Sequence, residues 1–271
     1  MISYMRKGDL MKPDYKNWMP EGLVISAVAA FAICMICSAL SSLYMAPGSL
    51  KSIVLTILLL LSIVLAYLSL KAVMMFRAFS YNGRRKLSKE VIDGIAARIS
   101  LSKGQKGLDV GCGSGALVIA CARRNPDAAF VGIDRWGKEY ASFNQSLCQR
   151  NAKAEGVSNV TFRQGNAVKL PFEDECFDAV FSNYVYHNIP SHDRQEILME
   201  TLRVLKKGGT FAIHDIFTKG KYGDMQAFVK KLKDMGYEKV ELIDTTNGLF
   251  MTRKEAGRLM LTGSALLAGR K

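Results

Sequence analysis

An apolar run that breaks abruptly into glycines constrains the fold of this chain more than any other feature. Leu108-Asp109-Val110 leads into Gly111-Cys112-Gly113-Ser114-Gly115, and a helix of small residues is expected over residues 116–123. Glycines lack a Cβ atom, so the backbone can turn sharply there and a ligand can approach it closely. The N–H groups at the start of the following helix offer donors to that ligand. The segment therefore predicts a strand, a turn and a helix around a nucleotide-type cofactor.

The glycine spacing alone fits two classes of cofactor. Gly111, Gly113 and Ala116 satisfy the degenerate G-x-G-x-x-G/A dinucleotide fingerprint, which keeps a nicotinamide-dependent oxidoreductase open. Asp109, two positions before the first glycine, and Gly115, a third glycine at a shorter spacing, favour another family. With them, the segment resembles the class I S-adenosylmethionine-dependent methyltransferases.

The resemblance continues downstream in the order of the family's motifs. A β-rich run, residues 129–134, ends in the carboxylate of Asp134 roughly twenty residues past the glycines. Residues 160–164 and 177–183 read as two further strands, and the first of them is followed by Gly165-Asn166-Ala167. The similar region runs from about Leu87 to the C-terminus. It implies S-adenosyl-L-methionine as the cofactor and a methyltransferase (EC 2.1.1) as the enzyme.

The same resemblance implies the cofactor site, residue by residue. Asp134 would hold the ribose hydroxyls, and Asn166 stands where the family often has an aspartate on the adenine amino group. Ser182 and Asn183, at the end of the fourth strand, would border the methyl group. The implied cofactor-binding residues are Asp109, Gly111, Cys112, Gly113, Gly115, Asp134, Arg135, Asn166, Ala167, Ser182 and Asn183. No metal site is expected.

Strands and helices alternate through this region, which predicts a parallel sheet covered on both faces, with ligands outside the carboxyl ends of its strands. The expected strands are 107–111, 130–134, 160–164, 179–183, 211–215, 239–244 and 264–269, and the expected helices are 88–101, 138–154, 192–205 and 222–235. The fold class is α/β, a doubly wound, mostly parallel seven-stranded sheet of the Rossmann-like methyltransferase type. The resemblance implies that the last strand inserts antiparallel between the fifth and the sixth.

Two long runs without a charged residue, 23–46 and 52–70, precede that domain, and the apolar residues 72–76 follow Lys71. Each run can cross a hydrocarbon core of about 30 Å at about 1.5 Å per residue. Residues 47–51, which contain Pro47 and Gly48, read as a turn between antiparallel spans. We therefore expect an α-helical transmembrane hairpin over residues 23–76, with spans of about 23–46 and 52–76. A cleaved signal peptide is the competing interpretation of the first run.

Basic residues set the expected orientation of the hairpin. The turn carries only Lys51, whereas basic residues flank both spans on the other side: Arg6, Lys7, Lys12, Lys16, Arg77, Arg84, Arg85, Lys86 and Lys89. Because lysine and arginine favour the cytoplasmic side, both termini and the catalytic domain should be cytoplasmic. The expected domains are an N-terminal segment (1–22), the hairpin (23–76), a basic juxtamembrane linker (77–86) and the methyltransferase domain (87–271).

The net charge of +13 indicates anionic partners. Much of the excess lies between residues 77 and 106, directly after the second span, where anionic headgroups would attract it by about 1 kcal/mol per basic residue. We therefore expect a lipid bilayer as the partner rather than nucleic acid. A solvated basic face without a partner is the alternative.

His187 is the candidate catalytic residue. Methyl transfer from a sulfonium depends mainly on positioning and desolvation. A hydroxyl or carbon-acid acceptor would also need a base, and His187 follows the fourth strand closely. A packing or capping role for His187 is the alternative, and His214-Asp215 ranks behind it as a second candidate.

The expected membrane hairpin indicates which class of methyl acceptor to expect. A membrane tether raises the effective concentration of the enzyme toward molecules dissolved in lipid. This favours a small lipophilic acceptor of a quinone-like, isoprenoid or lipid-headgroup kind. A polar metabolite or a protein is the alternative acceptor, and a membrane-anchored protein that binds S-adenosylmethionine without catalysis is the alternative function.

Overall fold

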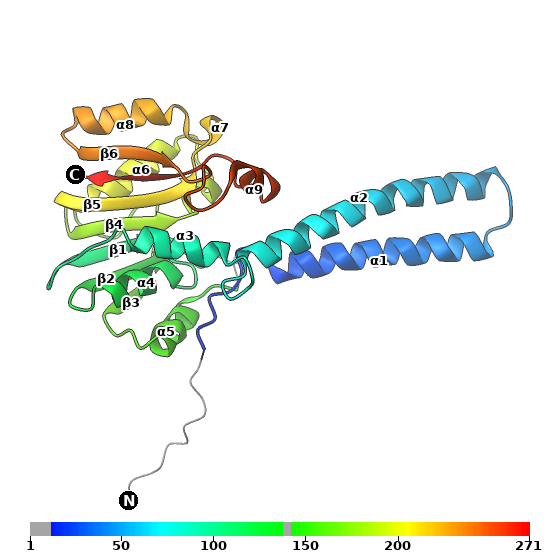
Figure 1. The fold of residues 1–271 in the computed structure, drawn as a ribbon, viewed down its shortest axis with the longest axis horizontal. Coiled ribbons are helices and arrows are strands. Elements are labelled where there is room, and N and C mark those ends of the chain that lie inside the picture. The colour runs from blue at the N-terminus through cyan, green and yellow to red at the C-terminus, as the bar shows by residue number, and fades with distance from the viewer. Residues whose placement is uncertain (1–11, 138–141) are drawn as a thin grey trace, which may run out of the picture. The chain divides into compact units, whose positions relative to one another are not determined.

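The computed structural model describes residues 12–137 and 142–271, which divide into two compact units. One unit is Asn17–Ser88. The other contains Lys89–Lys271 together with residues 12–16, so the helical unit is inserted in sequence between two parts of the second unit. Figure 1 colours the chain in order from blue to red.

The first unit is a pair of long helices, α1 (Glu21–Tyr44) and α2 (Ser49–Phe79), which lie side by side (Figure 1). Both are long and apolar enough to cross a membrane, by length and composition. The Ser69 hydroxyl donates to the carbonyl of Ala27 at 2.9 Å, and Lys51 Nζ donates to the carbonyls of Ser42 and Met45 at the end of α1. The helices cover most of the two expected runs, and α2 continues to Phe79, just before the turn at Asn82-Gly83.

The second unit alternates strands and helices. In chain order its elements are α3 (Leu87–Ala96), β1 (Lys106–Val110), α4 (Ala116–Arg124), β2 (Ala129–Asp134), α5 (Gln145–Ala154), β3 (Val160–Gln164), β4 (Phe177–Asn183), the 3-10 turn η2 (Tyr186–Asn188), α6 (Arg194–Arg203), β5 (Leu205–Ile216), α7 (Lys219–Tyr222), α8 (Met225–Asp234), β6 (Glu238–Asp244), α9 (Arg253–Arg258) and β7 (Ser264–Arg270).

Within the described residues the strands form one seven-stranded sheet in the order β3-β2-β1-β4-β5-β7-β6. Strands β1 to β5 pair in parallel, and β7 pairs antiparallel with both β5 and β6 (Figure 1). Apolar side chains of β1, β4 and β5 are fully buried together with those of α6 and α8, as expected for a sheet covered by helices. The expected fold class and the insertion of the last strand are confirmed.

Several element boundaries differ from the prediction for local reasons. Helix α3 ends at Ala96 rather than residue 101, and the Leu101 amide is bound instead by the Asn125 side chain. The helix expected over 222–235 is α8, which begins at Met225 rather than residue 222 because Gly223 takes a φ of +69° and Asp224 caps the helix; the short helix α7 precedes it. Part of the helix expected over 138–154 lies outside the described residues, and α5 begins at Gln145, capped by Asn144.

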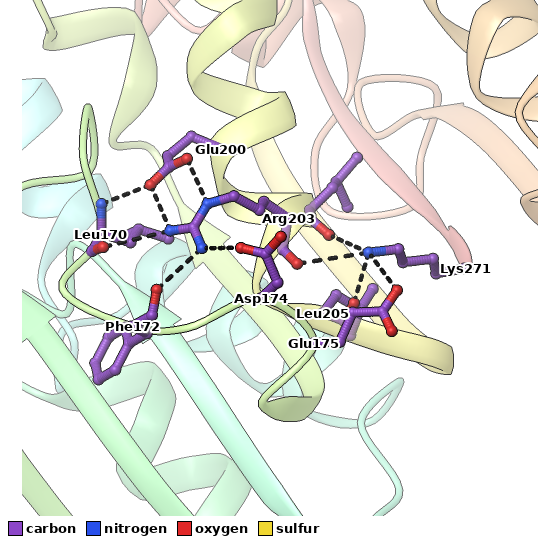
Figure 2. A network of polar contacts seen from close by, with 9 residues as sticks. Leu170, Phe172, Asp174, Glu175, Glu200, Arg203, Leu205 and Lys271 are labelled. Atoms are coloured by element: carbon purple, nitrogen blue, oxygen red, sulfur yellow. Dashed lines mark hydrogen bonds and ion pairs between the residues drawn. The ribbon is translucent and has the colours of Figure 1, made fainter.

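Hydrogen bonds and ion pairs connect the end of α6 with the loop before β4 and with Lys271, at the amino ends of β4 and β5 (Figure 2). Arg203, at the end of α6, binds Glu200 and Asp174 and donates to the carbonyl of Phe172 at 3.0 Å. Lys271 Nζ donates to the carbonyls of Leu202 at 3.0 Å and Leu205 at 2.8 Å. The network therefore fixes the edge of the sheet opposite the carboxyl ends of the parallel strands.

Candidate functional site

The glycine loop (residues 111–115) connects β1 to α4 at the carboxyl edge of the sheet. Gly111, Gly113 and Gly115 have φ angles of +78°, +55° and +85°, in the left-handed region that favours glycine. A Cβ atom on Gly111 would lie 2.3 Å from Val185 Cγ2. On Gly113 the nearest atom would be Phe143 Cδ2, at 4.0 Å. The loop is therefore packed closely against Val185 at Gly111 and less closely at Gly113.

Asp134, the last residue of β2, lies against this loop. Its Oδ2 accepts from the Gly113 N–H at 2.8 Å, and its Oδ1 accepts from the Trp136 N–H at 2.7 Å. The Trp136 indole N–H donates in turn to the Gly113 carbonyl at 3.0 Å. A carboxylate thus stands directly beside the glycine loop, and its expected contact with ribose hydroxyls stays a prediction.

Asp109 and Cys112 lie beneath the loop, out of reach of solvent. Asp109 Oδ2 accepts from the Val118 N–H in the first turn of α4, and burial raises the pKa of this carboxyl group well above its usual value. Burial likewise raises the pKa of the Cys112 thiol, which lies beside Cys148. Cys148 Sγ donates to the Gly113 carbonyl at 3.1 Å. These side chains support the loop and the start of α4.

Other predicted cofactor residues follow β2 and β3 at the same edge. Arg135 and Asn166 are exposed, and Ala167 is half-buried. Asn166 Oδ1 accepts from the Val168 N–H at 3.0 Å, which closes a turn after β3. Their contacts with a cofactor stay a prediction.

Ser182 and Asn183 are the last two residues of β4, but they differ in solvent exposure. Ser182 is fully buried, and its hydroxyl donates to the Val110 carbonyl at 2.7 Å, which ties β4 to β1. Asn183 is half-buried, and its Oδ1 lies 2.8 Å from Nδ1 of His214 on β5. The Ser182 side chain therefore reaches the neighbouring strand, and its expected contact near a methyl group stays a prediction.

His187 and Asp215 form a pair across the ends of β4 and β5. His187 Nδ1 lies 2.5 Å from Oδ1 of the fully buried Asp215. The same carboxylate accepts from the backbone N–H groups of Tyr186 at 2.8 Å and Ile216 at 2.6 Å. Because a carboxylate only accepts, His187 Nδ1 carries the proton and Nε2 has the lone pair. The pair can therefore take a proton at Nε2.

His214, by contrast, is a buried structural residue. Its Nε2 lies 3.0 Å from Thr245 Oγ1, and its ring centroid lies 4.6 Å from that of Tyr184 and 5.4 Å from that of Phe250. Burial lowers its pKa to about 3. The adjacent residues His214 and Asp215 therefore act separately, and only Asp215 reaches His187.

Sequence reasoning did not find the link between His187 and Asp215. The available signal was the order of the sheet, since β4 and β5 are neighbours and Asn183 stands opposite His214 in their register. Residues just past two neighbouring parallel strands meet at one edge. Trp136, whose indole binds the glycine loop, has no comparable signal in the sequence.

Comparisons with known proteins find methyltransferases. A family model described as a methyltransferase domain matches residues 101–257. Among curated relatives, the 27-O-demethylrifamycin SV methyltransferase of Amycolatopsis mediterranei is 30% identical over 144 residues, 53% of this chain and 50% of that protein. The demethylmenaquinone methyltransferase of Geobacillus stearothermophilus is 34% identical over 116 residues, 42% of this chain and 47% of that protein. The chain spans about half the length of these relatives.

Solved structures share the fold. The [4+2]-cyclase SpnF superposes with a TM-score of 0.53 at 20% identity, over 71% of this chain and 85% of that one. Phosphoethanolamine N-methyltransferase 2 of Haemonchus contortus, solved with S-adenosylhomocysteine, superposes with a TM-score of 0.52 at 17% identity, over 73% and 56%. At these identities the likeness concerns the fold alone.

Proposed function

The chain belongs to the class I S-adenosylmethionine-dependent methyltransferases, and from this premise we propose that it is a two-span membrane enzyme that methylates a small lipophilic acceptor. The observation that carries the proposal is the helix pair α1 and α2, two long apolar helices on a chain with a methyltransferase domain. The large apolar side chains of both helices are mostly exposed, which suits contact with lipid. In this proposal residues 23–76 span the bilayer, residues 77–86 are a basic linker, and both termini are cytoplasmic.

The residues of the glycine loop fit S-adenosyl-L-methionine, the cofactor of this family. Gly113 lacks a side chain and is less closely packed than Gly111, so a ligand can approach it, and the Asp134 carboxylate beside it can accept hydrogen bonds from hydroxyls. When bound, the cofactor supplies a methyl group on a positively charged sulfur. We assign its binding to Gly111, Gly113, Gly115 and Asp134, with Arg135, Asn166 and Ala167 further along the same edge. Asp109, Cys112 and Ser182 position the backbone of the site, and Asn183 borders it.

His187 is the proposed base for an acceptor hydroxyl or carbon acid. Asp215 accepts a hydrogen bond from the Nδ1–H group of His187, so Nε2 is the atom that removes a proton from the acceptor. The His187 side chain keeps 14% of its surface exposed, whereas Asp215 has none. His187 therefore contacts the acceptor and Asp215 is a positioning residue.

The proposed lipophilic acceptor has two further supports. The names of two relatives refer to rifamycin and menaquinone acceptors, both small molecules. In the connection between β6 and β7, at the carboxyl edge of β6, the Leu249 side chain is 45% exposed and the Met260 side chain is 63% exposed. The basic residues of α9, in the same connection, are exposed as well. Exposed apolar and basic side chains together suit an anionic bilayer surface.

The test is methyl transfer from labelled S-adenosylmethionine by the full-length protein in lipid nanodiscs. A membrane-lipid extract, a soluble metabolite extract and membrane protein serve as separate acceptor pools. We expect label in solvent-extractable lipids, and none with the Asp134→Ala variant. Label confined to metabolites or protein would contradict the lipophilic acceptor. Binding of S-adenosylhomocysteine without transfer to any pool would favour a non-catalytic binding protein.

A further inference from the structure

The segment just before the first apolar helix binds the catalytic unit. Residues 12–16, here called the N-terminal strap, belong to the same compact unit as the sheet. Tyr15 is only 6% exposed, and its hydroxyl donates to Glu155 Oε1 at 3.1 Å. Glu155 also pairs with Arg123 of α4 at 2.7 Å. The strap is thus tied to the ends of α4 and α5, although about 140 residues separate it from them in sequence.

The side-chain amide of Asn151, in α5, forms two hydrogen bonds with the backbone of Asp14, as a peptide group of a neighbouring strand would. Its Oδ1 accepts from the Asp14 N–H at 2.7 Å, and its Nδ2 donates to the Asp14 carbonyl at 2.9 Å. Nδ2 also donates to the carbonyl of Ser114 at 3.0 Å. Asn151 is 2% exposed, so each of these polar atoms needs its partner. One buried amide therefore joins the strap to the glycine loop.

A second, direct bond completes the link. The Ser114 hydroxyl, in the middle of the glycine loop, donates to the Tyr15 carbonyl at 2.8 Å. Ser114 is 6% exposed. A loop with three glycines in the left-handed region has little intrinsic stiffness, so bonds from other elements decide how well it is held. From the Asp134 side the loop is held at Gly113, and from the strap side it is held at Ser114.

We propose that the N-terminal strap is a positioning element of the cofactor site: through Asn151 and Ser114 it holds the glycine loop in the shape that binds S-adenosylmethionine. The apolar hairpin is then an insertion within the catalytic domain rather than an anchor that precedes the whole domain. This inference rests on the cofactor site proposed above. It predicts that changes at the strap weaken cofactor binding although none of its residues is in the glycine loop.

The first test compares two Asn→Asp variants of the full-length protein in detergent. Asn151→Asp can still accept from Asp14 but can no longer donate to Asp14 and Ser114. Asn159→Asp is the matched control, because the Asn159 amide also donates to three backbone carbonyls, those of Ala122, Asn125 and Ala128, away from the glycine loop. We expect Asn151→Asp to raise the Kd for S-adenosylhomocysteine by ~10-fold, as loss of a hydrogen-bonded contact does. The KM for S-adenosylmethionine should rise with it while kcat changes little.

Asn159→Asp should lower the thermal unfolding midpoint by a similar amount and leave the Kd unchanged. Equal Kd values for both variants at equal thermal stability would overturn the inference. Absence of binding in the unaltered protein would instead contradict the cofactor site, which separates the two failures.

A second measurement needs no variant. Because coupling between two sites is reciprocal, S-adenosylhomocysteine should slow hydrogen exchange at the strap, including the Asp14 amide that Asn151 binds. Slower exchange in both the strap and the glycine loop supports the inference. Slower exchange in the glycine loop with no change over residues 12–16 would overturn it, whatever the stability of the variants.

Discussion

At the scale of single residues, substitutions can test the roles proposed for His187 and Asp215, which lie in contact through Nδ1 and Oδ1. Replacing His187 by Gln removes the proton acceptor, and we expect kcat to fall by about 10²-fold for a hydroxyl or carbon-acid acceptor. S-adenosylhomocysteine should bind to the variant as before. The exposed His192→Gln is the matched control. An unchanged kcat would assign His187 to packing.

Asp215→Asn tests the positioning role of the carboxylate. An amide can donate to His187 Nδ1, which would place the ring proton on Nε2 and block its action as a base. We therefore expect the loss of kcat to approach that of His187→Gln, with the KM for S-adenosylmethionine little changed. Full activity in a folded Asp215→Asn protein would refute the assigned tautomer.

His214 predicts a pH dependence of stability. Its pKa is about 3 in the folded state and about 6.5 in the unfolded state, so the unfolded chain binds the proton more readily. The stabilisation from neutral His214 is complete above pH 6.5 and is lost as the pH falls toward 3. His214→Gln should flatten this part of the curve of unfolding midpoint against pH. An identical slope in the variant would show that other groups cause the loss.

At the scale of elements, the glycine loop offers a matched pair of substitutions. Gly111 and Gly104 have φ angles of +78° and +81°, but only at Gly111 would a Cβ atom meet another side chain. Gly104→Ala should cost about 1 kcal/mol from backbone strain and leave S-adenosylhomocysteine binding intact. Gly111→Ala should cost a further ~1–3 kcal/mol from the clash with Val185 and weaken binding. Calorimetric titration with S-adenosylhomocysteine and thermal unfolding would compare the two variants. Equal binding by both variants would contradict the proposed role of the glycine loop in cofactor binding.

Lys271 makes a second prediction at this scale. Its Nζ lies at the end of α6, where cations interact favourably with unpaired carbonyls, and its side chain is only 16% exposed. Lys271→Met should lower the free energy of unfolding by ~1–2 kcal/mol. Lys207→Met, at an exposed position on β5, removes the same charge as a control. Denaturant unfolding compares the two, and equal losses would mean that net charge rather than the network of Figure 2 is responsible.

The sequence predicted elements better than contacts. Strand positions followed from short apolar, β-rich runs between helical segments, and the choice of Asp134 followed from its distance to the glycines. The short helix α7 was not predicted, and α8 begins three residues later than expected because Gly223 and Asp224 end one helix and cap the next. The Asp215–His187 pair depends on which strands are neighbours, and the bonds of residues 12–16 join positions far apart in sequence, so no local period could reveal either.

At the scale of the whole molecule, the proposal of a membrane enzyme predicts that one edge of the catalytic unit touches lipid. Met260 and Met235 are similarly exposed, by 63% and 52%, but Met260 follows α9 at the catalytic edge and Met235 precedes β6 at the opposite edge. In nanodiscs with brominated anionic lipid, a tryptophan in Met260→Trp should be quenched more strongly than one in Met235→Trp, relative to unbrominated lipid. Equal quenching would remove the support that the exposed apolar residues give to a lipophilic acceptor.

The position of β7 has a consequence for synthesis of the protein. Strand β7 follows β6 in the chain and lies between β5 and β6, so β6 has no neighbour in the described sheet until β7 has been synthesised. Until then β5 presents an open edge, and open edges invite pairing with other chains. The apolar helices, by contrast, emerge early. A nascent chain therefore passes through a stage in which its apolar helices are already made while its catalytic sheet is unfinished, and a chain truncated before β7 remains in that state.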